Sequence, residues 1–482
     1  MILLPAGGAI LIGAAIVFLL WPMPLRASMR LLAAASMGIG AGIGVCSSLY
    51  FLWLAALGPR AGALAVVEAA ILAAVSAAAF LKLRRHGEIE ASTARDAAPG
   101  WLTAALIAVA AAGTLIFILQ VLRNPHGGWD AFSIWNLRAR FLERGGDFWR
   151  DAFSVKIPWT HPDYPLLLPG MVAMSAALSG AESTLGPIGI AFLFLAATAG
   201  VLMGTLAVAR GRTQALLAGI LLLGTPAFLL LAAYQYADVP LSFYIAATLG
   251  ALCLQDEDRG AAGLGAIAGA MAGFAAWTKN EGVLFVAVVV VARALSLVRF
   301  EGVKAATRRM AAFGAGLLPP LAVLAIFKIG FAAPNDLTAA QAGNSLLSNL
   351  LDAGRYVTVL SAFVRQAIAL GGFMAPILLV LAAYLYLVRP AVEEKHRVTA
   401  WTLVLTVGLM LAGDFGVYQL LSYALEFQLR TSLDRILLQV WPAGILTFFF
   451  LAGTPQLRAP VEEKRAAMKR ERKVSRKTAE TR

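Results

Sequence analysis

The feature that most constrains this chain is a succession of long apolar stretches that carry almost no charge. A helix that crosses a bilayer needs about 20 such residues, because its backbone polar groups must be paired within the lipid. Apolar residues make up 60% of the 482 residues and charged residues only 14%, which excludes a water-soluble enzyme. We therefore expect an all-α, polytopic membrane helix bundle of about thirteen spans. The expected spans are 2–21, 31–57, 61–81, 101–122, 184–209, 213–234, 239–254, 263–277, 283–298, 310–331, 368–388, 398–421 and 437–453.

The distribution of Lys and Arg predicts the orientation of these spans. With the N-terminus outside, 27 of the 40 Lys and Arg residues fall in inside segments, as the positive-inside rule requires. The long loop 123–165 then lies outside, and the run 166–180, interrupted by Pro169 and Gly170, is expected to be a short surface helix. High Ala and Arg usage and the lack of a transit peptide favour a bacterial inner membrane, with this loop facing the periplasm.

The net charge of +13 does not predict a nucleic-acid partner, because part of it is confined to the tail. The 25 residues from Arg458 to Arg482 contain ten Lys and Arg residues and four Asp and Glu residues. We expect this tail to be cytoplasmic and the lipid bilayer to be the main partner of the rest of the chain. The sequence contains no GxxxxGK[ST], HExxH or GxSxG pattern, so nucleotide hydrolysis, zincin and serine-hydrolase chemistry have no motif support.

The first long outside loop contains a candidate catalytic carboxylate, Asp130. It follows the pair Gly127-Gly128, which permits either a close backbone approach to a ligand or a tight turn. It precedes an amphipathic segment that predicts a helix on the membrane surface. Because Asp is a good N-cap, its carboxylate either caps this helix or takes part in chemistry, or both. The residues expected on the apolar face are Phe132, Trp135, Ala139 and Leu142.

A proline-bounded motif, His161-Pro-Asp163-Tyr164-Pro165, follows in the same loop. Proline restricts its own backbone and that of the preceding residue, so these polar side chains are held in a rigid segment. This arrangement suits a binding site, although a surface histidine is more often inert.

Charged residues also gather at the outside ends of later spans. Asp238 stands directly before the seventh span, where it either caps a helix or faces a protein cavity. Lys279 and Glu281 lie between the eighth and ninth spans and mark either a site or a solvated turn. The last outside loop, 423–436, contains Arg430 and, at the membrane boundary, Arg435, which serve either as phosphate ligands or as anchors.

The order of these motifs resembles the GT-C superfamily of membrane glycosyltransferases, above all the branch with protein O-mannosyltransferases and lipid A aminoarabinose transferases. The resemblance covers roughly residues 100–330, and the last loop loosely. It rests on Asp130 followed by a surface helix, on the motif His161 to Pro165, on Tyr234-x-x-x-Asp238-x-Pro240 and on the turn Thr278-Lys279.

This resemblance implies a GT-C-type bundle that transfers a sugar from a polyprenyl-phosphate-linked donor to a hydroxyl of a lipid, glycan or protein acceptor. Transfer would occur at the outer, periplasmic face with inversion at the anomeric carbon. The implied catalytic residues are Asp130 and Asp238, and the implied contacts to the donor phosphate are Lys279, Arg435, His161 and Arg138. Asp163, Tyr164, Tyr236 and Glu281 would organise the acceptor or the loop. A divalent metal, with Asp130, Asp238 and His161 as ligands, is a further expectation from the same resemblance.

The sequence departs from the family at two positions. Ala131 follows Asp130 where members often have a second acidic residue, which weakens a metal-dependent mechanism. Tyr164 stands where the lipid A relatives have a lysine, so either His161 or Lys156 supplies that positive charge or the donor contact differs.

Three segments and two alternative functions complete the expectation. Residues 1–100 would be additional N-terminal helices with a cytoplasmic loop, 101–453 the catalytic core and 454–482 the basic tail. A transporter or flippase of lipid-linked sugars is the first alternative, and it predicts ionisable groups along a path at the midplane. A membrane scaffold is the second, and in it Asp130 and Asp238 only cap helices.

Overall fold

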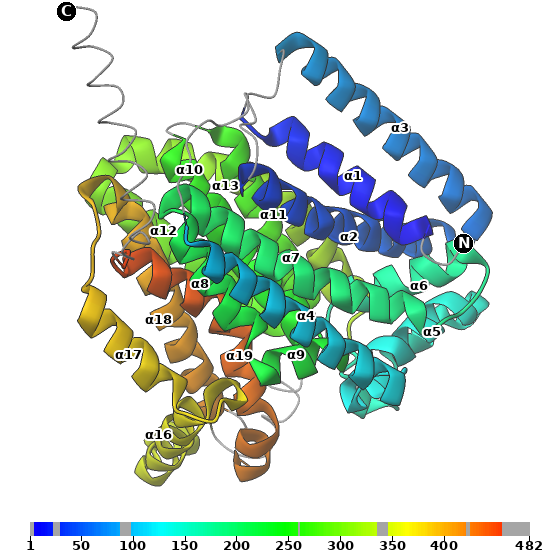
Figure 1. The fold of residues 1–482 in the computed structure, drawn as a ribbon. Helices are drawn as coiled ribbons and strands as arrows, with labels where there is room; N and C mark the ends of the chain where they lie inside the picture. Colours follow the sequence, from blue (N-terminus) through cyan, green and yellow to red (C-terminus); the bar gives the residue numbers. More distant parts are fainter. Residues whose placement is uncertain are drawn as a thin grey trace, which may run out of the picture.

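The computed structural model describes residues 4–22, 29–86, 98–258, 261–334, 346–420 and 425–455. These residues fold into α-helices joined by short 3₁₀ and π segments, with one isolated antiparallel bridge between Pro390 and Ala452 (Figure 1). The basic tail from residue 456 onward lies outside the described residues. The main helices are α1 (Leu4–Leu20), α2 (Met29–Leu57), α3 (Ala61–His86), α4 (Gly100–Arg123), α5 (Asn136–Arg144), α6 (Leu167–Ser179), α7 (Leu185–Ala209), α8 (Arg212–Leu223), α9 (Pro226–Ala233), α10 (Asp238–Glu257), α11 (Ala262–Thr278), α12 (Asn280–Glu301), α13 (Val303–Gly330), α15 (Leu346–Leu351), α16 (Ala353–Ile368), α17 (Ile377–Val388), α18 (Arg397–Leu420) and α19 (Leu425–Leu451).

The prediction of an all-helical, multi-pass membrane protein is confirmed at the level of helix length and composition. Nine of the described helices are long and apolar enough to cross a membrane, and the number rises to eleven if each of two bent pairs is one span. The sequence-based number of thirteen also includes α1 and α11, which have only 17 residues each. Both lie at the lower limit of what can cross a bilayer.

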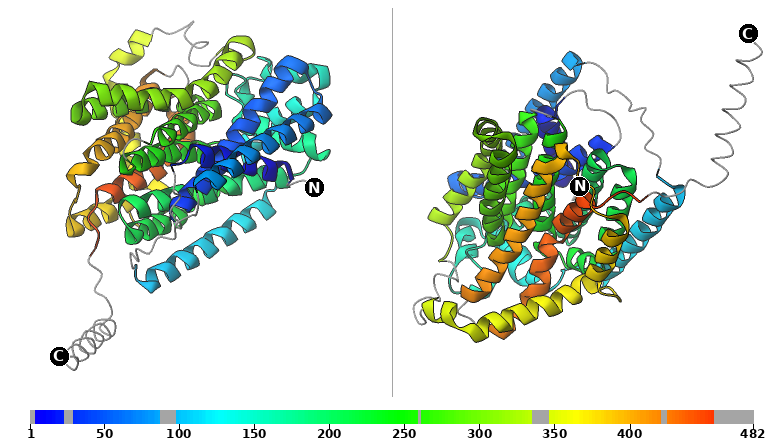
Figure 2. Two further views of the ribbon diagram at one scale, coloured as in Figure 1. Left: turned by 90° about the horizontal axis from the view of Figure 1, so that it is seen from above. Right: turned by 90° about the vertical axis from the view of Figure 1, so that its left-hand side faces the viewer.

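The two bent pairs show where hydropathy misplaced a boundary. The expected span 213–234 is divided into α8 and α9, which meet at 63° where Pro226 begins the second helix. Within the expected span 368–388, the helix α17 begins only at Ile377. The angle between α17 and the preceding helical segment, Ala353–Gly372, is 82°. Figure 2 shows this preceding helix, α16, lying across one end of the bundle. The sequence analysis did not predict α16 as a helix.

Other helices are longer than predicted because polar residues continue them beyond the apolar run. The helices α10 and α12 have 20 and 22 residues and are therefore longer than the expected spans 239–254 and 283–298. The helix α19 begins at Leu425, so most of the expected loop 423–436 is helical. Its first turns combine charged residues with buried Leu433, a pattern that hydropathy alone cannot distinguish from a loop.

The core of the bundle is centred on α10, in which every residue from Asp238 to Gln255 is buried. It packs against α7, α11 and α19, while α3 lies at the edge of the molecule beside α1 (Figure 1). The small residues of α2 allow the close helix contacts that their spacing predicts. A Cβ atom on Gly42 would lie 1.8 Å from the carbonyl oxygen of Ala9 in α1, and one on Gly40 would lie 2.1 Å from the Phe243 ring in α10. Residues 29–57 of the predicted N-terminal segment are thus packed against the central helix.

The long loop 123–165 contains a π-helical turn, Ala131–Trp135, that continues into α5. Of the residues expected on the apolar face, Trp135, Ala139 and Leu142 are buried and Phe132 is 43% exposed. An exposed Phe132 is compatible with the expected position of this helix at the membrane surface, but the π turn before α5 was not predicted. The run 166–180 forms the short helix α6, as expected.

Candidate functional site

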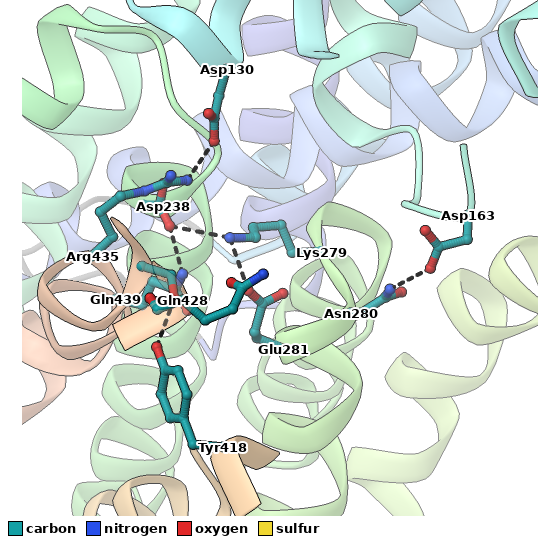
Figure 3. Close-up of polar contacts among 11 residues, drawn as sticks. Asp130, Asp163, Asp238, Lys279, Asn280, Glu281, Tyr418, Gln428, Arg435 and Gln439 are labelled. Carbon is teal, nitrogen blue, oxygen red and sulfur yellow. Dashed lines mark hydrogen bonds and ion pairs between the residues drawn. The ribbon is translucent and has the colours of Figure 1, made fainter. Parts of the chain in front are cut away.

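The charged residues predicted from separate parts of the sequence meet around Arg435 of α19. Its Nη2 atom lies 2.6 Å from Oδ2 of Asp130 and 2.9 Å from Oδ2 of Asp238 (Figure 3). Its guanidinium also lies over the ring of Tyr236, 4.6 Å from the centroid. The side chains of Asp130 and Arg435 are 16% and 19% exposed, so this part of the cluster is accessible from one side.

Lys279 extends the cluster into the protein. Its Nζ atom lies 3.2 Å from Oδ1 of Asp238 and 2.9 Å from Oε1 of Glu281 (Figure 3). Burial by itself lowers the pKa of this ammonium, but the two carboxylates more than offset that effect and raise the pKa above its ordinary value. Lys279 is therefore a permanent positive charge. We call Asp130, Asp238, Lys279, Glu281 and Arg435 the central network, and the end of the bundle that holds it the network end.

Gln439 is a member of this environment that the sequence analysis missed. Its Nε2 atom donates a hydrogen bond of 2.5 Å to Oδ1 of Asp238, and the side chain is buried. It lies one turn after Arg435 on α19, so both side chains fall on the same face of the helix. The spacing of four residues was the available signal, but it was hidden because residues 423–436 were expected to be a loop.

The interpretation of Asp130 and Asp238 as helix caps is wrong. Asp130 precedes the π turn with helical backbone angles and makes no side-chain capping bond. Asp238 is the first residue of α10 and likewise makes no such bond. Both carboxylates are directed at Arg435 instead, so their interactions are tertiary rather than local.

The Gly127-Gly128 pair gives the loop a tight turn and a close approach to protein rather than to open space. Gly127 has a φ of +79°, and the N–H of Gly128 donates to the carbonyl oxygen of Tyr234 at 3.0 Å. A Cβ atom on Gly128 would lie 2.7 Å from the hydroxyl oxygen of Tyr236. Burial, and then the charge of Asp130, raise the pKa of this phenol, so it stays neutral at physiological pH.

A second polar cluster forms around Asp163. Asn280 donates to Oδ2 of Asp163 at 2.7 Å (Figure 3). Lys328 of α13 donates to the Asp163 carbonyl at 2.6 Å and to Oδ1 of Asn280 at 2.8 Å. Lys328 was expected only as an isolated charge within a span, and Asn280 was not singled out, although it stands between Lys279 and Glu281 in the sequence. The contact between α13 and the loop is a tertiary one that no local sequence pattern indicates.

Arg138 and His161 have structural surroundings within the same loop. Arg138 is fully buried and donates to the carbonyl oxygen of Tyr164 at 2.8 Å. Burial lowers the pKa of this guanidinium to about 9, although Asp163 opposes the change. His161 adopts a left-handed backbone with a φ of 48°, and its ring stacks on Tyr164 at 4.7 Å.

Tyr164 lies between the two clusters. Its ring stacks on Trp135 at 5.8 Å, and the Nζ atom of Lys279 lies 6.0 Å from its centroid. Burial raises the pKa of this phenol well above its ordinary value, followed by the charges of Glu281 and Asp163. The structure thus places Asp130, Asp238, Tyr236, Lys279, Glu281 and Arg435 around one centre, and Arg138, His161, Asp163 and Tyr164 in the adjoining loop.

The expected metal ligands do not converge on one point. Asp130 and Asp238 both contact Arg435, whereas His161 stacks on Tyr164. Among the described residues, no three His, Cys, Asp or Glu side chains form a group that could hold a metal ion. The residues present therefore do not fit the metal site that the resemblance implied.

Comparisons with protein-family models, with curated proteins and with solved structures find no match to this chain. The chemistry of the site must therefore be argued from its geometry. The partly exposed guanidinium of Arg435 can bind an anionic group, and the partly exposed carboxylate of Asp130 beside it can accept a proton from a nearby hydroxyl.

Proposed function

We propose that the protein is a membrane glycosyltransferase that moves a sugar from a polyprenyl-phosphate-linked donor to an acceptor hydroxyl. The observation that carries this proposal is the bridging of Asp130 and Asp238 by Arg435, with Lys279 on the far side of Asp238. A leaving phosphate needs fixed positive charge, and an attacking hydroxyl needs a carboxylate within reach. Both requirements meet at one end of a membrane bundle.

In this proposal the bundle is of GT-C type. It has thirteen spans when α1, α11 and each bent pair are counted as crossings. The network end faces the periplasm of a bacterial inner membrane, where lipid-linked donors and acceptors are both accessible.

The reaction breaks the bond between the anomeric carbon and the phosphate oxygen and forms one between the anomeric carbon and the acceptor oxygen. The electron pair of the broken bond leaves with polyprenyl phosphate, whose charge Arg435 and Lys279 stabilise. The acceptor proton passes to Asp130. Attack from the side opposite the phosphate inverts the configuration of the sugar.

The charges of the central network suggest how the donor would activate Asp130. Three carboxylates, Asp130, Asp238 and Glu281, face the two cations Lys279 and Arg435. A further anion can bind only if a carboxylate gives up its cation. Asp130 is more exposed than Asp238, so the donor phosphate would replace it on Arg435 and free it to act as the base.

Asp238 is a positioning residue in this mechanism. It is buried and holds Arg435, Lys279 and Gln439 in place. Glu281 has the same role toward Lys279. The second cluster would hold the His161–Pro165 loop, with Lys328 supplying the positive charge that a lysine at position 164 would otherwise provide.

The two alternative functions lack comparable support. Transport requires ionisable groups along a path through the midplane. Three ionisable groups within the expected spans are candidates for such a path: Glu68, Lys328 and Asp414. Glu68 lies against Gly8 at the α1–α3 edge, Lys328 contacts the Asp163 loop, and Asp414 is buried within α18. The scaffold interpretation requires Asp130 and Asp238 to be caps, which they are not.

The test is an assay of purified protein with a panel of radiolabelled polyprenyl-phosphate sugars and candidate acceptors. We expect wild type to release polyprenyl phosphate, and Arg435→Gln to release it at least ~100-fold more slowly. If Arg435→Gln fails to fold, Arg435→Lys is measured in its place, because it keeps the positive charge but not the guanidinium. Arg430→Gln, an exposed arginine of the same helix, is the matched control and should behave as wild type. Donor binding without turnover across all acceptors would favour the transporter instead.

A further inference from the structure

A cavity of about 160 Å³ lies at the network end, outside the central network. Its walls come from α5, from α6 and from the segment that leads into α7. Small residues leave this space open, because Ala139, Ala173 and Ala176 line it where larger side chains would fill it. The volume corresponds to about five water molecules, which is the scale of one sugar ring.

The polar side chains of this cavity favour an uncharged ligand. Its lining includes the carboxylates Glu143 and Glu182 and the guanidinium of Arg140. Arg144 lies beside them, in an ion pair with Glu182, so two carboxylates are matched by two guanidiniums. An anion would meet the carboxylates and a cation would meet the arginines, whereas hydroxyl groups can donate to the former and accept from the latter.

One carboxylate in the cavity wall can accept a further hydrogen bond from a ligand. The Oε2 atom of Glu143 accepts no hydrogen bond among the described residues, and its ion-pair partner, the Nε atom of Arg144, lies 3.9 Å away. Burial, and then the charge of Glu182, raise the pKa of Glu143. A hydroxyl group that donates to this oxygen would stabilise the charged carboxylate.

The cavity adjoins the central network through a polar contact. Asn136, which lines the cavity, donates to Oε1 of Gln235 at 3.0 Å. The next residue, Tyr236, lies under the guanidinium of Arg435. A second, narrow space of about 10 Å³ is lined by both Asn136 and Tyr236. The cavity therefore adjoins the central network without a wide opening between the two.

We infer that this cavity binds one uncharged sugar unit through Glu143, Arg140 and Asn136. This assignment rests on the proposed function. The bound sugar unit belongs to the acceptor, and the reacting hydroxyl is on the neighbouring part of the acceptor rather than on this unit. The acceptor is then a glycan or glycolipid rather than a protein hydroxyl. The apolar walls formed by the alanines contact the C–H face of the sugar.

Binding can be measured without catalysis by saturation-transfer NMR. The probes are methyl glycosides of glucose, galactose, mannose, N-acetylglucosamine and arabinose, each at millimolar concentration with the purified full-length protein. We expect at least one glycoside to bind wild type. Ala176→Leu should abolish that binding by filling the cavity, and Glu143→Gln should weaken it about tenfold. Two controls should bind as wild type. They are Ala112→Leu, at an exposed position of α4, and Asp147→Asn, at an exposed position of the loop 123–165.

Two results would overturn the inference, provided that the variants match wild type in thermal stability. One is that no glycoside binds wild type, and the other is that binding survives Ala176→Leu. Release of polyprenyl phosphate in the presence of the acceptor panel serves as a separate readout. Its absence in wild type would count against the proposed function and not against the cavity.

Discussion

Two buried ion clusters lie at the two ends of α10, and they are built from the same chemistry. At one end Asp238 is held by Arg435 and Lys279, and at the other Asp256 is held by Arg293 and Arg309. Asp256 follows Asp238 by 18 positions, which corresponds to about 27 Å along the helix axis. Arg293 binds Asp256 through both terminal nitrogens, at 2.6 and 2.9 Å. Each cluster therefore joins several helices through one carboxylate.

The clusters differ in charge balance and backbone. Around Asp256 two carboxylates, Asp256 and Glu301, match two arginines; the side chains of Asp256 and Arg293 are 5% and 1% exposed, and that of Glu301 is 33% exposed. All four residues lie in regular helices. The central network has a surplus carboxylate and takes Asp130 and Lys279 from a turn and a helix junction. A balanced cluster in regular helices stabilises a fold, whereas one with a surplus carboxylate can exchange a partner for a ligand.

The largest expected effect on stability is at the Asp256 cluster. Asp256→Ala leaves Arg293 and Arg309 buried without their shared carboxylate, and removing one partner of a buried pair costs about 3–5 kcal/mol. We expect a large fall in unfolding midpoint, measured by thermal or denaturant unfolding in detergent. Turnover per folded molecule should not change. A normal midpoint together with lost turnover would reverse the roles that we assign to the two ends.

At the central network the larger effect should be on turnover. Lys279→Gln removes one of the two cations that face the phosphate, and we expect about a 10²–10³-fold loss in polyprenyl-phosphate release. The matched control is Lys304→Gln, an exposed lysine near the other end of the bundle. Equal activity of the two variants would exclude Lys279 from the site.

Helix content and the choice of charged residues could be predicted from the sequence, because hydropathy identifies apolar helices and polar residues at their ends stand out. What could not be predicted is pairing. Nothing local links Arg435 to Asp130, which is 305 residues away, or Lys328 to the Asp163 loop. Gln439 and Asn280 were missed because an amide gains its role only from the carboxylate it meets. The π turn before α5 and the bend at Pro226 also escaped patterns based on an ideal helix.

The second cluster should have a smaller effect than the central network. Lys328→Met removes one hydrogen bond to the Asp163 carbonyl and one to Asn280 of α12, and because the lysine is 29% exposed we expect about 1–2 kcal/mol of destabilisation. The loop should also become more susceptible to limited proteolysis. Unchanged stability and unchanged proteolysis would show that Lys328 does not hold the loop.

The smallest expected effect separates backbone shape from charge. Gly128→Ala places a Cβ atom against the Tyr236 hydroxyl, and we expect about 1–3 kcal/mol of destabilisation from overpacking. Tyr236→Leu in the same chain removes both the hydroxyl and the ring carbons that the new Cβ atom would meet, so Gly128→Ala should cost less in that background. If Gly128→Ala costs as much there as in wild type, the close contact does not account for the glycine.

The most direct test of the contrast between the two ends is a paired measurement on Asp130→Asn and Asp256→Asn. For each variant, sugar transfer per folded molecule and the unfolding midpoint are measured in the same preparation. We predict that Asp130→Asn loses transfer by about 10²–10⁴-fold with an unchanged midpoint, because it removes a general base. Asp256→Asn should lose stability with unchanged transfer per folded molecule. Full transfer by Asp130→Asn, in an enzyme that is active as wild type, would contradict the central claim that the network around Arg435 is the site of chemistry.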